Sequence, residues 1–83
     1  MRRKKDKVLK IKDDVNLKEL ENFGYDDFGV CYKKYGILGE QYFIDKGTRK
    51  ITRIHPYSLR EEPTLDEVLD LNQYGYVEKV DDR

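Results

Sequence analysis

Apolar and polar positions follow two different periods along this chain. Residues 7–12, "KVLKIK", alternate between apolar and charged side chains, which is the two-residue period of a half-buried strand. Farther on, Leu17, Leu20 and Phe23 recur at every third position and so share one face of a helix. The pattern therefore predicts a strand over residues 7–12 and a short helix over residues 17–23.

Two similar stretches mark the ends of predicted helices. "LENFGY" ends the first helix with Gly24, and "LNQYGY" ends the second with Gly75. Each helix also has a capping-box spacing at its start, "NLKE" at 16–19 and "TLDE" at 64–67. Glycine is favoured just past a helix because the left-handed conformation adopted there strains any Cβ. We expect two Schellman-type stops, each leading into a strand. Shared capping chemistry is the simpler explanation of the echo, and duplication of a helix–strand unit is the alternative.

Between the helices, the sequence predicts strands joined by tight turns. Residues 30–35, "VCYKKY", alternate moderately, and residues 40–54 have the pattern of a hairpin in which Asp45 opens the turn and Gly47 takes a left-handed position. Residues 55–63 connect this hairpin to the second helix, which a final strand follows. These elements predict an α+β fold with a small antiparallel sheet of four to five strands and two short helices on one face, in the order β-α-β-β-β-α-β.

The length of 83 residues predicts one domain over residues 1–83, because chains that divide into two cores are usually much longer. The formal net charge is zero, but residues 1–12 hold seven basic side chains against one acidic, and residues 61–83 hold eight acidic against two basic. We expect residues 1–6 to form a flexible basic tail and both charged ends to be solvated. A basic arm for phosphate, or an acidic face for a basic partner, is the alternative.

The sequence contains no recognisable catalytic or metal-binding pattern. Cys31 is the single cysteine and His55 the single histidine, which leaves neither an internal disulfide nor a usual Cys/His metal site. A Cys31–His55 nucleophile pair lacks an orienting acid and an oxyanion motif, so we interpret the two as a small core residue and a surface residue. Phosphate loops, dinucleotide fingerprints and calcium loops are also missing. We expect no enzymatic activity, no cofactor and no metal.

The amino-terminal sequence predicts a cytoplasmic location. The start "MRRKKDK" has the charge of a signal peptide, but "VLKIKDD" follows it where a longer apolar run belongs. No stretch of the sequence approaches the length of a transmembrane helix. We therefore expect a cytoplasmic protein without membrane association, and a thin core of this size suits a monomer or a weak homodimer.

The tyrosine content indicates a binding surface. Seven tyrosines are more than a core of this size requires, and tyrosine is enriched at protein interfaces. The predicted function is therefore protein–protein interaction, with an unidentified partner bound at the tyrosine-bearing open face of the sheet. A tyrosine-covered sheet surface without a partner is the alternative interpretation. The predicted binding residues are Tyr32, Lys33, Lys34, Tyr35, Tyr42, Arg49, Arg53 and Tyr57.

Nucleic-acid binding is the alternative function. Residues 32–35 and 49–53 combine tyrosine rings with Lys and Arg, and such side chains stack on bases and contact phosphates. The basic residues 2–5 of the tail would add phosphate contacts. The pI of about 6.6 and the lack of an RNP, KH or helix-turn-helix pattern weigh against this function, since domains of this kind are typically strongly basic.

Two segments carry a resemblance to a known group of proteins. "VLKIKDDVNLKELENFGY" and "LDEVLDLNQYGYVEKV", in a chain without alanine or tryptophan, resemble small uncharacterised proteins of low-GC Gram-positive bacteria and their phages. The resemblance implies no catalytic activity and no particular site residues. A phage or prophage origin would suggest a host-takeover or anti-defence protein that acts by binding.

Overall fold

The computed structural model describes residues 7–37, 39–55 and 63–81. These residues form two antiparallel sheets and two short helices, joined by turns and loops. The four-stranded sheet keeps its strands in sequence order: β2 (Asp26–Asp27), β3 (Cys31–Tyr35), β4 (Gln41–Asp45) and β5 (Ile51–Ile54). The two-stranded sheet pairs β1 (Lys7–Ile11) with β6 (Val77–Asp81). The helices are the 3₁₀-helix η1 (Leu17–Phe23) and the α-helix α1 (Leu69–Gln73). The predicted α+β class is confirmed.

The prediction of one continuous sheet is wrong, because the first and last strands form a sheet of their own. Within the described residues, β1 and β6 pair along their whole length. The link from β1 to the larger sheet is a single bridge, Lys10 opposite Lys50, together with the N–H of Ile11, which donates to the carbonyl of Arg49 at 2.9 Å. The periodicity of a sequence identifies strands but not their partners, since pairing depends on residues far apart in the chain.

The predicted order β-α-β-β-β-α-β also lacks strand β2. Its two residues pair antiparallel with Lys33 and Tyr32 of β3. Asp26 and Asp27 are both exposed and carry no apolar alternation, so the sequence gives no strand signal there. The first helix stop therefore leads into β2, and the chain turns at residues 28–30 before it enters β3.

Both predicted helix stops are confirmed as Schellman motifs. Gly24 and Gly75 are left-handed, with φ angles of 91° and 74°. The N–H groups of these glycines donate to the carbonyls three residues back, at 3.3 and 3.0 Å. The longer bonds that complete the two motifs join the Tyr25 N–H to the Leu20 carbonyl (3.2 Å) and the Tyr76 N–H to the Leu71 carbonyl (3.1 Å).

The helix starts agree with the sequence only in part. Asn16 caps η1, and its side chain accepts a hydrogen bond from the Lys18 N–H at 3.0 Å. Thr64 and Glu67 form the predicted reciprocal capping bonds, from the Thr64 N–H to Glu67 Oε1 (2.8 Å) and from the Glu67 N–H to Thr64 Oγ1 (3.3 Å). Turns follow this second pair, and α1 begins only at Leu69. The observed helix therefore starts later than the capping box predicts.

The turn between β4 and β5 differs from the prediction in one residue. Asp45 opens the turn, and its carboxylate accepts hydrogen bonds from the N–H groups of Gly47 (2.9 Å) and Thr48 (2.7 Å). The left-handed residue is Arg49, with φ 67°, and not Gly47. The Arg49 guanidinium donates to two carbonyls of the β1–η1 loop, and these bonds hold the residue in a conformation that arginine rarely adopts.

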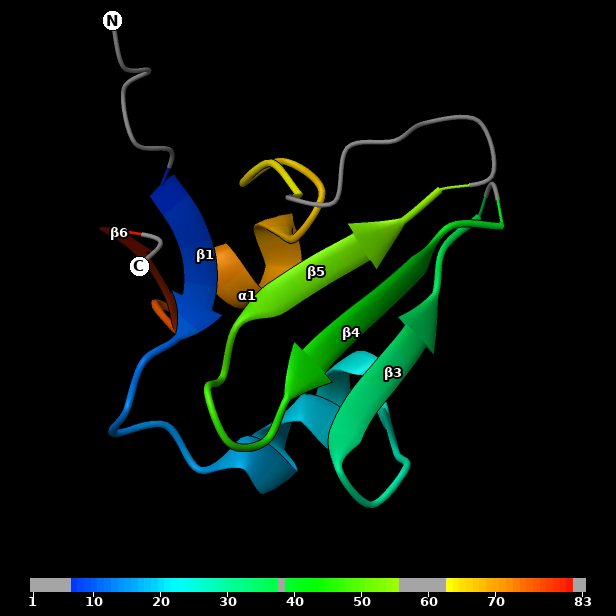
Figure 1. The fold of residues 1–83 in the computed structure, drawn as a ribbon, viewed down its shortest axis with the longest axis horizontal. Helices are drawn as coiled ribbons and strands as arrows, with labels where there is room; N and C mark the ends of the chain where they lie inside the picture. The colour runs from blue at the N-terminus through cyan, green and yellow to red at the C-terminus, as the bar shows by residue number, and fades with distance from the viewer. Residues whose placement is uncertain (1–6, 38, 56–62, 82–83) are drawn as a thin grey trace, which may run out of the picture.

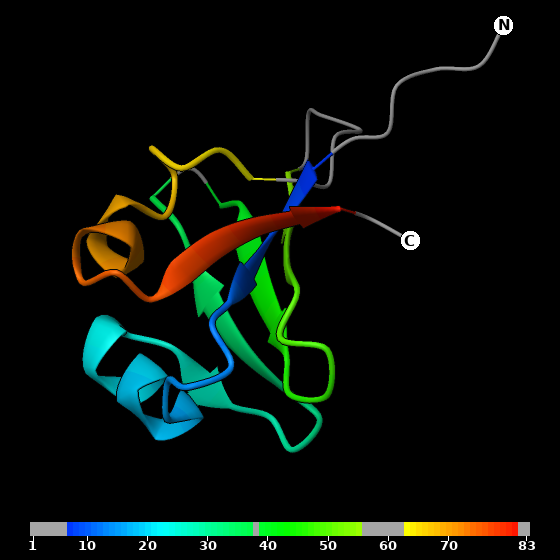
Figure 2. The ribbon, with the colours of Figure 1, turned by 90° about the vertical axis from the view of Figure 1, so that its left-hand side faces the viewer.

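The main core lies between the four-stranded sheet and the two helices. Figures 1 and 2 show η1 and α1 on the same side of β3, β4 and β5, as the sequence predicts. Fully buried side chains come from every layer: Ile44 and Ile51 from the sheet, Leu20 from η1, Leu71 from α1 and Ile11 from β1. Within the described residues, the opposite side of the sheet has no covering element (Figure 1).

Replacing Gly75 with valine is expected to lower the free energy of unfolding by about 1 kcal/mol through left-handed strain. A Cβ at this position would have no neighbouring atom within 4 Å, so steric overlap adds nothing to the strain. Urea denaturation monitored by circular dichroism measures the difference. Gly75→Asn is the control, because asparagine tolerates the left-handed region and should lose less. Equal stability of the valine variant and the wild-type protein would contradict the assignment of this stop.

Candidate functional site

Strand alternation divides the predicted binding residues between two faces of the four-stranded sheet. Tyr32, Tyr42 and Arg53 point toward the helices and keep only 2%, 6% and 6% of their surfaces exposed. Their prediction as open-face residues is therefore wrong. Side chains two positions apart share a face. Tyr42 is thus fixed inward with Ile44, and Arg53 with Ile51, both of which are fully buried.

Two further basic residues predicted for the open face are engaged inside the fold. Lys34 is partly buried; its Nζ lies 3.4 Å from the Asp70 carboxylate of α1 and 5.3 Å from the centre of the Tyr25 ring. Arg49 donates to the carbonyls of Lys12 and Val15, each at 2.7 Å. Both residues connect elements of the fold, and the structure does not place them in the open face of the sheet. Tyr57, the last predicted tyrosine, lies outside the described residues.

Lys33 and Tyr35 are the predicted residues that the structure does place on the open side of the sheet. They form two neighbouring cross-strand rows with residues of β4 and β5. The first row contains Lys33, Phe43 and Thr52, and the second contains Tyr35, Gln41 and Ile54. Phe28, in the turn before β3, adds a third aromatic ring beside Lys33. We call the set Phe28, Lys33, Tyr35, Phe43 and Ile54 the outer-face patch.

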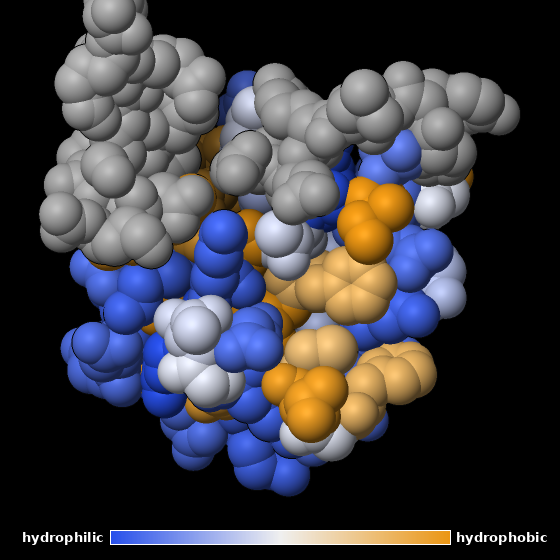
Figure 3. Space-filling view, viewed as in Figure 1, coloured by the Kyte–Doolittle hydropathy of each residue, from blue (hydrophilic) through white to orange (hydrophobic). Residues whose placement is uncertain are grey.

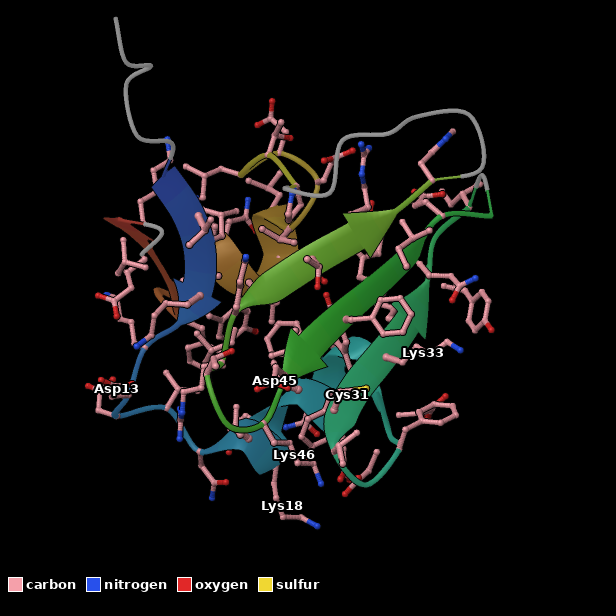
Figure 4. The ribbon with its side chains drawn as sticks, in the orientation of Figure 1. Asp13, Lys18, Cys31, Lys33, Asp45 and Lys46 are labelled. Carbon is pink, nitrogen blue, oxygen red and sulfur yellow. The ribbon has the colours of Figure 1, made fainter. Side chains whose placement is uncertain are left out.

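The ammonium group of Lys33 lies at the centre of the aromatic part of this patch. Its Nζ is 5.1 Å from the ring centres of Phe28 and Tyr35 and 5.5 Å from that of Phe43. Figure 4 shows Lys33 on β3, on the side of the sheet away from the helices. A cation this close to the face of a ring is attracted by about 0.5–1 kcal/mol at exposed sites, so the rings hold the lysine over the sheet.

The outer-face patch is largely exposed. Phe28, Tyr35 and Ile54 keep 55%, 61% and 53% of their surfaces accessible. Figure 3 shows hydrophobic side chains gathered on this side of the molecule, over the strands of the larger sheet. Exposed apolar side chains that gather on one face often mark an interaction site. The arrangement offers apolar contact area with one positive charge in its middle.

Sequence reasoning missed Phe28, Phe43 and Ile54 as members of the site. In "QYFID", the residues Tyr42 and Phe43 are both suited to a strand, and alternation sends one inward and the other outward. The fully buried neighbour Ile44 was the available signal, because an inward isoleucine requires Phe43 to point outward. Phe28 stands in a turn and carries no periodic signal.

The described acids near this surface form no ion pair with Lys33. Asp26, on the edge strand β2, stands directly opposite Lys33 in the strand pairing and is exposed, but no ion pair joins the two side chains. Asp45 stands opposite Cys31 at the end of β4, and the N–H groups of its own turn occupy its carboxylate. The hydrogen bond from the Thr48 backbone is the largest of the effects that lower the Asp45 pKa. Asp27 is similarly engaged by Lys46 at 2.7 Å, and that hydrogen bond lowers the Asp27 pKa.

Two of the buried tyrosines, Tyr25 and Tyr42, have raised pKa values. Burial, and secondarily the Asp70 carboxylate, raises the pKa of Tyr25 far above its ordinary value of 10.0. Burial and then the hydrogen bond that the Tyr42 hydroxyl donates to Glu40 at 3.1 Å raise the pKa of Tyr42 to about 12. Both residues serve the core as neutral phenols.

These pKa shifts predict a loss of stability at alkaline pH. The unfolded chain releases the tyrosine protons near pH 10, whereas the folded protein retains them, so stability falls as pH rises from about 10 toward the folded pKa values. The slope from each tyrosine reaches about 1.4 kcal/mol per pH unit. Urea denaturation between pH 9 and about 11 should show a shallower fall for Tyr25→Phe than for the wild-type protein. Exposed Tyr35→Phe is the control, and parallel curves for all three proteins would refute the effect.

No group of three or more His, Cys, Asp or Glu side chains among the described residues is placed to hold a metal ion. No helix among the same residues is long and apolar enough to cross a membrane.

The fold and the site together define a small α+β protein with antiparallel sheets of four and two strands and one exposed aromatic and aliphatic sheet face. Comparisons of this chain with protein-family models, with curated proteins and with solved structures found no match.

Proposed function

We propose that this protein is a non-enzymatic binding module whose outer-face patch contacts another protein. The observation that carries the proposal is the exposure of Phe28, Tyr35 and Ile54 on the sheet face that no described element covers. Aromatic side chains dominate the energetics of protein interfaces because they bury large areas and lose little rotamer entropy. We further propose a cytoplasmic location, and the resemblance to phage proteins suggests host takeover or evasion of host defence as the setting.

Nucleic-acid binding remains the second candidate because of one feature, the three rings around Lys33. Rings and a cation on an open sheet are also the parts of a platform for single-stranded nucleic acid. Such a platform needs several cations to follow the phosphates. The other basic residues expected on this sheet, Lys34, Arg49 and Arg53, are directed to intramolecular partners. A protein partner is therefore the better supported proposal.

Affinity capture from an extract of cells that produce the protein tests the proposal. We expect a specific partner to be recovered with the wild-type chain, and about tenfold less of it with Tyr35→Ala or Phe43→Ala, because truncation of an aromatic hot-spot residue at the centre of an interface removes at least this much affinity. Tyr74→Ala is the matched control, since Tyr74 is 67% exposed but lies at the end of α1. Circular dichroism establishes that all variants are folded.

Two outcomes of the capture experiment would contradict the proposed interface. Equal recovery by the wild-type chain and both patch variants, or loss only with Tyr74→Ala, would dismiss the outer-face patch as the interface. Recovery that depends on nucleic acid would favour the second candidate. Nuclease treatment of the extract and a salt titration detect it, because affinity for a phosphate backbone falls steeply with salt.

A further inference from the structure

Lys33 differs from several other lysines of the fold in what surrounds its ammonium group. Among the described residues, no carboxylate lies within ion-pair distance of Lys33, and three aromatic rings take the place of one. Other described lysines face an acid: the pairs are Lys10 with Asp13, Lys18 with Glu21, Lys34 with Asp70 and Lys46 with Asp27. The positive charge at the centre of the outer-face patch is thus available to an anion from outside.

The position of this charge restricts what can cover the patch. Lys33 lies between Phe28, Tyr35 and Phe43, so a partner that buries these rings also removes water from the ammonium group. Burying a charge without a counter-charge is strongly unfavourable. A purely apolar partner would therefore bind poorly, and a partner with a carboxylate opposite Lys33 would gain both apolar contact and a charge-assisted hydrogen bond.

A second copy of this chain offers one exposed carboxylate beside the patch, that of Asp26 on β2 opposite Lys33. A symmetric dimer through the outer-face patch would place the same surface on both sides of the interface and would bring two Lys33 charges into one apolar contact. Asp27 and Asp45 are engaged by Lys46 and by turn N–H groups, so a dimer would have to pair Lys33 of each copy with Asp26 of the other. Like charges in a desolvated contact disfavour any other arrangement of the two copies. Concentration-dependent dimerisation that Lys33→Glu abolishes would make a second copy the occupant in place of a partner segment.

We propose that the outer-face patch recognises an acidic and apolar segment of a partner protein, with an Asp or Glu carboxylate on Lys33 and apolar side chains on the flanking rings and Ile54. This inference rests on the proposed function and adds to it the chemistry of the partner. Lys33 is then the residue that determines specificity, because it selects a partner anion, while the rings supply contact area.

Selection from a displayed library of random short peptides against the immobilised full-length chain tests the inference. We expect selected peptides to contain Asp or Glu beside Leu, Ile, Phe or Trp, and to cause NMR shifts at Phe28, Phe43 and Lys33. Lys33→Glu should weaken these peptides by about tenfold or more, and selection against that variant should yield Lys or Arg instead. Lys33→Met, which keeps the apolar stem without the charge, should remove the preference for acids. Lys79→Glu, at an exposed site on β6, should leave the selected peptides bound.

The remaining outcomes refute either the role of Lys33 or the protein-binding function as a whole. Peptides that perturb the patch but show no enrichment of acids, and that bind Lys33→Met and Lys33→Glu as well as the wild type, would refute the role of Lys33 and leave the protein-binding function intact. Peptides that map elsewhere, or a library that yields no binder, would refute both. Tight binding of a homopolymeric single-stranded oligonucleotide at the same residues, in the absence of peptide binders, would replace a protein partner with nucleic acid.

Discussion

Replacing Glu67 with alanine is expected to destabilise the protein by about 3 kcal/mol, the largest single effect we predict. Arg53 keeps only 6% of its surface exposed, and its guanidinium Nη1 lies 2.5 Å from the Glu67 carboxylate. The substitution takes this carboxylate away from a guanidinium in a poorly solvated site, and removal of one partner of a buried ion pair is strongly destabilising. The substitution also removes the capping bond from the Thr64 N–H. Urea denaturation at neutral pH measures the loss.

Two further variants distinguish loss of the ion pair from other effects of replacing Glu67. The double variant Arg53→Met, Glu67→Met should recover most of the stability, because apolar replacement of both partners also removes the cost of desolvating them. Glu78→Ala provides a matched control: Glu78 pairs with Lys10 at 3.8 Å in a more exposed setting, where such pairs contribute about 1 kcal/mol or less. If Glu67→Ala is no more harmful than Glu78→Ala, the buried pair does not stabilise the fold.

The second large effect concerns Arg49, whose replacement by alanine should cost about 2–3 kcal/mol. The guanidinium donates to the carbonyls of Lys12 and Val15, each at 2.7 Å and partly buried. Hydrogen bonds that involve a charged group contribute about 1.5–3 kcal/mol. These bonds tie the loop after β1 to the β4–β5 turn, so they join the two sheets. Thermal or urea unfolding measures the change.

The left-handed backbone of Arg49 supplies an internal control for this prediction. Its φ angle of 67° strains alanine as well as arginine, whereas glycine adopts it without strain. Arg49→Gly loses the same hydrogen bonds but relieves the strain, so it should be more stable than Arg49→Ala by roughly 1 kcal/mol. If both variants are as stable as the wild type, the guanidinium does not bridge the sheets. Partner capture under native conditions should be unchanged, because Arg49 lies outside the outer-face patch.

The basic residues show where the sequence is insufficient. The sequence predicts Lys33, Lys34, Arg49 and Arg53 as binding residues, and the structure places only Lys33 of these in the outer-face patch. Long side chains with apolar stems can enter a core or cross a loop when a carboxylate or carbonyl receives the charged end. Asp70, Glu67 and the loop carbonyls play that part here, and no local pattern in the sequence reveals which acid a given cation will meet.

What the sequence determined by itself is local. The glycine stops of both helices, the Asx-type turn at Asp45 and the strand segments follow from preferences that act within a few residues, and the structure shows each of them. The α+β class follows from the order of those segments.

Only the tertiary structure decided which strands pair and which side of each strand faces the helices. β1 meets β6 from the opposite end of the chain, and Phe43 rather than Tyr42 faces outward because Ile44 enters the core. A shift of one residue exchanges the two faces of a strand, and the two aromatics have similar strand preferences. The contact surface is therefore set by long-range packing of the core, which selects one face and leaves the other exposed.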